Sequence, residues 1–127
     1  MKTILVDAAG TFVIEGQGVY RQLYELLETY PNRKIIVSNA NDVQLIEYGI
    51  VNMPYEVFTL KHNPNKDNPE YFRILLNRFN LTVEDVLYFE HNQPAVDSAK
   101  SIGIASYFYD PDKKDLESLK QFLDQNL

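Results

Sequence analysis

The sequence contains no cysteine among its 127 residues. This absence excludes disulfide bonds, zinc sites built from thiolates and catalytic cysteine nucleophiles. Positive charge is also scarce, because 12 Lys and Arg residues oppose 18 Asp and Glu residues and give a formal net charge of −6. We therefore expect neither a broad nucleic-acid-binding surface nor attraction to an anionic membrane. A small phosphorylated ligand stays compatible with this charge, since local backbone dipoles can hold an anion.

Long apolar runs are missing as well. The N-terminal apolar stretch is too short for a signal peptide, and no segment is long enough to span a bilayer. We therefore expect a cytoplasmic location. Hydrophobic residues still make up 45% of the chain, which suffices for a core and argues against disorder. The length suits a single domain over residues 1–127.

Short apolar runs alternate with segments of helical periodicity. The runs predict five buried strands, at Thr3–Val6, Lys34–Val37, Tyr55–Leu60, Val86–Phe89 and Ile104–Tyr109. The periodic segments predict five helices, at about Val19–Tyr30, Val43–Tyr48, Pro69–Phe79, Pro94–Ser101 and Leu116–Leu123. A small flap or hairpin is expected at Phe12–Ile14, because glycines follow it.

This alternation predicts an α/β fold, a Rossmann-like three-layer sandwich of about five parallel strands with helices on both faces. Ligands of such sheets bind beyond the carboxyl ends of the strands. The candidate site residues are therefore the polar ones near those ends, namely Asp7, Ser38, Lys66, Glu90 and His91.

Each candidate alone also has an ordinary structural explanation. Asp7 suits a nucleophile or a metal ligand, but it equally suits a cap of the loop that follows its strand. Ser38 is suited to bind a phosphoryl oxygen, or equally to start a helix. Lys66 is suited to offset a developing negative charge, or equally to be a solvated loop lysine, and Glu90 is suited to bind a divalent cation. Only their convergence would favour phosphoryl chemistry.

Four segments together resemble the motifs of the haloacid-dehalogenase superfamily. Residues 6–11, Val-Asp-Ala-Ala-Gly-Thr, resemble the first motif, and residues 36–39, Ile-Val-Ser-Asn, are similar to the second. Residues 66–72, Lys-Asp-Asn-Pro-Glu-Tyr-Phe, are similar to the segment with the family's lysine. Residues 87–92, Leu-Tyr-Phe-Glu-His-Asn, resemble the fourth motif. The four segments follow the family's order and cover most of the chain.

The resemblance implies a phosphohydrolase that forms an aspartyl-phosphate. Asp7 takes the position of the nucleophile, and Lys66 takes the position that offsets the charge of the phosphoryl group. The implied substrate-binding positions are Thr11, Ser38, Asn39 and Lys66. The implied cofactor is Mg²⁺, with metal positions at Asp7, Ala9 (through its main chain), Glu90 and His91.

Two positions depart from the family pattern. Ala9 stands where the family has the Asp that acts as general acid and base, a contribution of about 10²–10⁴-fold. We therefore expect weak activity, confined to good leaving groups such as acyl or aryl phosphates. His91 stands where the family usually has a metal-binding Asp, and imidazole suits softer cations than Mg²⁺. Mg²⁺ binding is accordingly expected to be weak, or replaced by another divalent cation.

The spacing between the motifs predicts no cap domain, because only an ordinary helix and its connections separate the first motif from the second. Phosphonoacetaldehyde hydrolases resemble this chain in having Ala at the position of Ala9, but they depend on a lysine from a cap. An open, capless site favours a phosphorylated small molecule or an exposed phosphate on a macromolecule.

Two other functions compete with this interpretation. A catalytically inactive domain, kept for binding or scaffolding, is favoured by Ala9 and His91. The retained Asp7, Ser38 and Lys66 disfavour it. A response-regulator receiver domain fits the length, but receivers carry paired acids after the first strand and the phosphorylated Asp after the third. Here the third strand ends in Thr59-Leu60-Lys61, which argues against a receiver.

Overall fold

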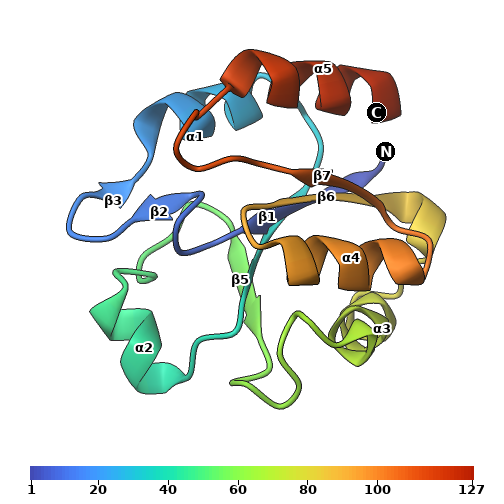
Figure 1. Ribbon diagram of the computed structural model, residues 1–127, viewed down its shortest axis with the longest axis horizontal. Helices are drawn as coiled ribbons and strands as arrows, with labels where there is room; N and C mark the ends of the chain where they lie inside the picture. Colours follow the sequence, from blue (N-terminus) through green and yellow to red (C-terminus); the bar gives the residue numbers. More distant parts are fainter.

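Five parallel strands form the central sheet of the computed structural model, which describes residues 1–127 (Figure 1). They are β1 (Thr3–Asp7), β4 (Lys34–Ser38), β5 (Glu56–Thr59), β6 (Val86–Glu90) and β7 (Ala105–Phe108). Their order across the sheet is β5-β4-β1-β6-β7. The flap is a two-stranded hairpin of β2 (Val13–Ile14) and β3 (Gly18–Val19). Each predicted strand of the main sheet agrees with the observed one to within one residue at each end.

Helices cover both faces of the sheet, which confirms the predicted α/β sandwich (Figure 1). They are α1 (Arg21–Glu28), α2 (Asp42–Glu47), α3 (Pro69–Arg78), α4 (Gln93–Ser101) and α5 (Leu116–Asn126), with a 3₁₀ turn η1 at Val83–Asp85. Helices α1 and α5 pack on one face, and α3 and α4 pack on the other. None of the helices combines the length and the apolar character that a membrane span requires.

Local sequence signals set where the helices begin. Asn41 forms a capping box with Gln44 at the start of α2, and the Asn68 side chain accepts a hydrogen bond from the backbone of α3. These contacts satisfy N–H groups that have no partner inside the helix. Asn92 caps α4 in the same way, directly after the strand that carries Glu90. The caps therefore fix the loops that carry the candidate residues.

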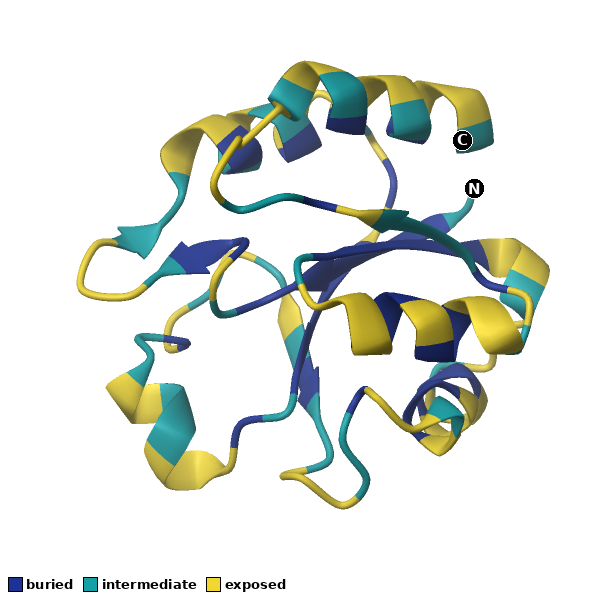
Figure 2. Cartoon of the chain, viewed as in Figure 1, coloured by how far each residue is buried: buried dark blue, intermediate teal, exposed yellow.

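The central strand β1 contributes side chains to two separate cores. Ile4 and Val6 pack with the residues of α1 and α5, whereas Leu5 packs with those of α3 and α4. All three are completely buried, because β1 has a neighbouring strand on each side and helices on each face (Figure 2). Burial on both faces explains why Ile4, Leu5 and Val6 are all apolar.

Tyr71 of α3 fastens the ends of two strands to each other. Its hydroxyl accepts a hydrogen bond from the Ser38 amide at 3.1 Å and lies 2.9 Å from the Ser38 carbonyl oxygen and 3.1 Å from that of Phe58. The residue has no exposed surface, so water cannot replace its hydroxyl. The hydroxyl therefore helps to hold β4 and β5 together beside the candidate site.

We predict that Tyr71→Phe lowers the free energy of unfolding by about 1–3 kcal/mol, because it removes the partner of buried backbone groups. Urea unfolding of the variant and of the wild type measures the loss. The matched control is Tyr30→Phe, which removes a hydroxyl bonded to the exposed side chain of Asp124. Water can replace that partner, so the control loses less stability, and equal losses would contradict the assigned role of Tyr71.

Candidate functional site

A pocket of about 350 Å³ lies at the carboxyl ends of β1, β4 and β6. The predicted site residues that line it are Asp7, Ala9, Ser38, Asn39, Lys66, Glu90 and His91. Thr11 is the exception: it does not line the pocket but lies behind Asp7, where its hydroxyl donates a hydrogen bond to the carboxylate at 2.6 Å. Residues up to 84 positions apart in the chain thus converge on one carboxylate.

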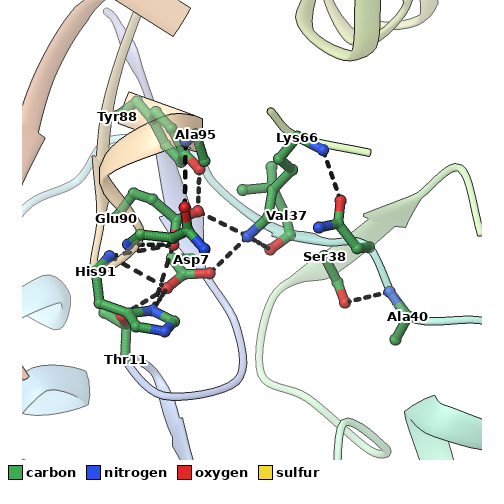
Figure 3. A network of polar contacts seen from close by, with 12 residues as sticks. Asp7, Thr11, Val37, Ser38, Ala40, Lys66, Tyr88, Glu90, His91 and Ala95 are labelled. Carbon is green, nitrogen blue, oxygen red and sulfur yellow. Dashed lines mark hydrogen bonds and ion pairs between the residues drawn. The ribbon is translucent and has the colours of Figure 1, made fainter. Parts of the chain in front are cut away.

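Lys66 joins the two buried carboxylates of the site. Its ammonium nitrogen lies 2.6 Å from Asp7 Oδ1 and 2.7 Å from Glu90 Oε1 (Figure 3). All three side chains are at least nine-tenths buried. The backbone amide of Lys66 donates to Asn39 Oδ1 at 2.7 Å, which holds the loop before α3 against the end of β4. The lysine is therefore positioned from both its backbone and its side chain.

His91 approaches Asp7 from the side opposite Lys66 (Figure 3). Its Nδ1 contacts Asp7 Oδ2 and lies 3.3 Å from both Glu90 Oε2 and Thr11 Oγ1. An ionised carboxylate can only accept hydrogen bonds, so Nδ1 carries the proton in this contact. Oδ2 of Asp7 is therefore bonded to Thr11 and His91, whereas Lys66 is the hydrogen-bond partner of Oδ1.

Both oxygens of the Glu90 carboxylate accept hydrogen bonds. Oε1 accepts from Lys66 and from the hydroxyl of Tyr88, and Oε2 accepts from the backbone amides of His91 and Asn92 at 3.1 and 3.2 Å. Sequence reasoning missed Tyr88, because a tyrosine within an apolar strand resembles any other core residue. The signal was its spacing of two from Glu90, which places both on the same face of a strand.

Ser38 offers a hydroxyl to the pocket. Its Oγ accepts a hydrogen bond from the Ala40 amide at 3.0 Å, which orients the side chain and leaves its own proton available. The pocket is also lined by His62, Asn65 and Tyr48, which the sequence analysis did not single out. They come from loops and from the end of α2, where no motif marks them.

The charges in the site perturb one another strongly. Burial alone would raise the pKa of Asp7, but the Lys66 ammonium and the hydrogen bond from His91 hold the pKa of this carboxyl well below its usual range. Burial and the neighbouring charge of Asp7 raise the pKa of Glu90. Hydrogen bonds to Asp7 and then to Glu90 raise the pKa of His91 to about 10. Two cationic side chains therefore face two acidic ones.

Sequence comparison with known proteins gives only a partial match. No family model matches the sequence. A segment of the chain is 41% identical over 69 residues to the large ribosomal subunit protein uL15 of Chlorobaculum tepidum, covering 51% of the chain. The chain spans only 37% of the length of that protein, so the match does not extend a ribosomal role to it.

Solved structures match nearly the whole chain. A D,D-heptose 1,7-bisphosphate phosphatase from B. bronchiseptica, in complex with magnesium and phosphate, is 14% identical, covers 100% of both chains and has a TM-score of 0.70. A HAD-family enzyme from Bacteroides thetaiotaomicron is 12% identical over 94% of this chain and 98% of its own, with a TM-score of 0.68. A putative β-phosphoglucomutase from Thermotoga maritima is 14% identical over 85% of each chain, with a TM-score of 0.60. The chain therefore has the fold of the haloacid-dehalogenase-like enzymes, as its motifs predict.

The implied Mg²⁺ ion does not fit the side chains present. One ligand atom each of Asp7, Glu90 and His91 lie within 4.8 Å of one another, which is the spacing of a metal site. However, Mg²⁺ takes oxygen ligands and keeps several waters, whereas here Nδ1 of His91 points its proton at both carboxylates. The ammonium of Lys66 occupies the other side of the same carboxylates. Mg²⁺ therefore has no vacant place among these side chains.

We predict that Lys66→Met destabilises the fold by about 3–5 kcal/mol at neutral pH, because two buried carboxylates lose the cation between them. The loss should shrink on acidification toward pH 5, since protonation of one carboxyl relieves the repulsion. Urea unfolding at both pH values measures it.

The matched control for this prediction is Lys61→Met. Lys61 pairs with Asp42 at 3.1 Å, but both side chains are more than half exposed. Removing an exposed pair costs less than about 1 kcal/mol at either pH. A loss for Lys66→Met as small as that of the control would refute the bridging role of Lys66.

Proposed function

We propose that the protein is a phosphohydrolase that cleaves acyl phosphates and phosphate esters with good leaving groups, through an aspartyl-phosphate on Asp7. The observation that carries the proposal is the unequal bonding of the two Asp7 oxygens. Oδ2 is held by Thr11 and His91, whereas Oδ1 is bonded only to Lys66 and keeps a lone pair for attack. The low pKa of Asp7 keeps this carboxylate ionised and ready to react.

The reaction has two steps. Oδ1 attacks phosphorus, and the bond between phosphorus and the leaving oxygen breaks, so that the leaving group departs with its electron pair. Water then attacks the phosphorus of the aspartyl-phosphate, and the bond between phosphorus and Oδ1 breaks, which restores the carboxylate. The inorganic phosphate keeps one proton of this water, and the other passes to solvent. Lys66 offsets the charge of the transferring phosphoryl group, and Ser38 supplies a hydrogen-bond donor to one of its oxygens.

The pocket lacks an acid beside the attacking oxygen. Ala9 lines the pocket two residues after Asp7, and its methyl group cannot protonate a leaving oxygen or activate water. A carboxylate released from an acyl phosphate needs no proton, and an aryl oxide needs one far less than an alkoxide does. The proposed substrates are therefore those whose leaving groups depart unaided, and turnover is slow.

Two observations support the proposed class of substrate. The matching enzymes named for a heptose bisphosphate and a phosphoglucose act on phosphorylated small molecules. The short connections that predict a capless site also favour a phosphate that projects from a larger molecule. We propose a phosphorylated small molecule or an exposed phosphate group on a macromolecule, bound by Ser38, Asn39 and Lys66 in the pocket beside Asp7.

A non-catalytic phosphate-binding role is the second candidate. Two observations favour it: the missing acid at Ala9, and the firm hold that Thr11, His91 and Lys66 have on Asp7. In this role Lys66 and Ser38 would bind a phosphate group without cleaving it. The two candidates differ in whether phosphate is released from a labile substrate.

We expect slow release of phosphate from acetyl phosphate and p-nitrophenyl phosphate, abolished by Asp7→Asn. Colorimetric phosphate release measures it, and circular dichroism verifies that the variant is folded. The control is Asp97→Asn, which changes an exposed acid on α4 and should leave turnover unchanged. Equal turnover by Asp7→Asn and wild type would exclude Asp7 as nucleophile, and no turnover at all would favour the binding role.

Restoring an acid at position 9 tests the explanation for slow turnover. Ala9→Asp should raise turnover of an alkyl phosphate by about 10²-fold or more, and turnover of acetyl phosphate by much less. The ratio of the two gains measures the need for a proton donor. Equal gains for both substrates would show that the missing acid does not limit the reaction.

A further inference from the structure

The imidazole ring of His91 lies between the two carboxylates that a divalent cation would bridge. Nδ1 contacts Asp7 Oδ2 and lies 3.3 Å from Glu90 Oε2. Lys66 contacts the other oxygen of each carboxylate. The lysine therefore contacts one oxygen of each acid, and the histidine lies beside the other oxygen (Figure 3).

The surrounding backbone makes room for this ring. A Cβ atom at Gly10 would lie 2.8 Å from Cε1 and 2.9 Å from Nε2 of His91, closer than such atoms approach in proteins. Gly10 also has φ of +88°, a conformation that other residues rarely adopt. Thr11 Oγ1 lies 3.3 Å from Nδ1 on the same side. Gly10 therefore leaves space for the ring beside Asp7, and 33% of the His91 side chain stays exposed.

We propose that His91 takes the place of the divalent cation, so that this site holds phosphate and acts without a metal ion. The inference rests on the phosphate site of the proposed function and adds which side chain stands where the metal would bind. Lys66 and His91 together lie within 3.3 Å of all four oxygens of the two carboxylates, so a divalent ion would have to displace one of these side chains. His91 thus positions Asp7 by fixing Oδ2, which leaves Oδ1 toward the pocket.

The inference also explains one departure from the family pattern. A site without a metal has no use for an acidic ligand at position 91. An acid at position 91 would instead add a third carboxylate beside Asp7 and Glu90. Three carboxylates around one lysine would need a divalent cation to offset their repulsion.

The test compares the wild type with His91→Asp by thermal unfolding, in a chelator and in Mg²⁺ or Mn²⁺, with inorganic phosphate as the ligand probe. In the wild type, neither metal should raise Tm, and phosphate should raise it equally with and without chelator. His91→Asp should have a lower Tm than the wild type in chelator. Mg²⁺ should then raise the Tm of the variant by about 4 °C or more in a saturable way.

Two further variants keep the test decisive. His62→Asp adds an acid to the same pocket at the other histidine of the chain, away from Asp7, and should gain no Mg²⁺ response. His91→Asn keeps a hydrogen-bond donor of similar size but carries no charge. It should bind phosphate about tenfold or more weakly than the wild type in chelator, even if His91→Asp fails to fold.

The outcomes separate this inference from the proposed hydrolysis. A saturable response of the wild type to Mg²⁺ or Mn²⁺, or a failure to bind phosphate in chelator, overturns the inference. Unchanged phosphate affinity of His91→Asn overturns it as well. Metal-independent phosphate binding without any release of phosphate from acetyl phosphate would refute the hydrolase and leave the role of His91 intact. Turnover that requires Mg²⁺ would refute the metal-free role of His91 and support the hydrolase.

Discussion

The contact of one lysine with two buried carboxylates is the interaction on which the site depends. Asp7 and Glu90 lie at the ends of neighbouring central strands, where burial would drive two acids toward neutrality. Lys66 keeps Asp7 ionised by lying 2.6 and 2.7 Å from the two carboxylates. The loop that brings Lys66 there is itself held by Asn39. The stability of the fold and the proposed chemistry therefore depend on the same ion pairs.

Most of the fold was predictable because a buried parallel sheet has a simple sequence pattern. The run Lys34–Val37 is apolar and β-branched after its lysine, and it forms β4 almost as predicted. The edge strands are less apolar, and β7 (Ala105–Phe108) has no fully buried residue. Gly103 and Asp110 mark its ends, and Ala105 and Tyr107 pack against the core although neither is fully buried.

The sequence predicted which residues form the candidate site better than it predicted the contacts between them. Asp7, Ser38 and Glu90 were identified because strand ends of a parallel sheet meet at one edge. Thr11 was expected in the binding pocket, and nothing in the sequence distinguishes that position from one behind the carboxylate. The bond from Tyr88 to Glu90 depends on the side chains that surround it in three dimensions. Residue type and spacing cannot supply that information.

The register between the two central strands has a consequence for how the protein can change. Val6 lies opposite Phe89, so Asp7 and Glu90 follow as the next pair on the opposite face. A shift of β6 by one position would turn Glu90 into the core that holds Phe89, and would turn the ring of Phe89 toward the pocket. A one-residue insertion or deletion in β1 or β6 would therefore disrupt the site, whereas substitutions leave the register intact.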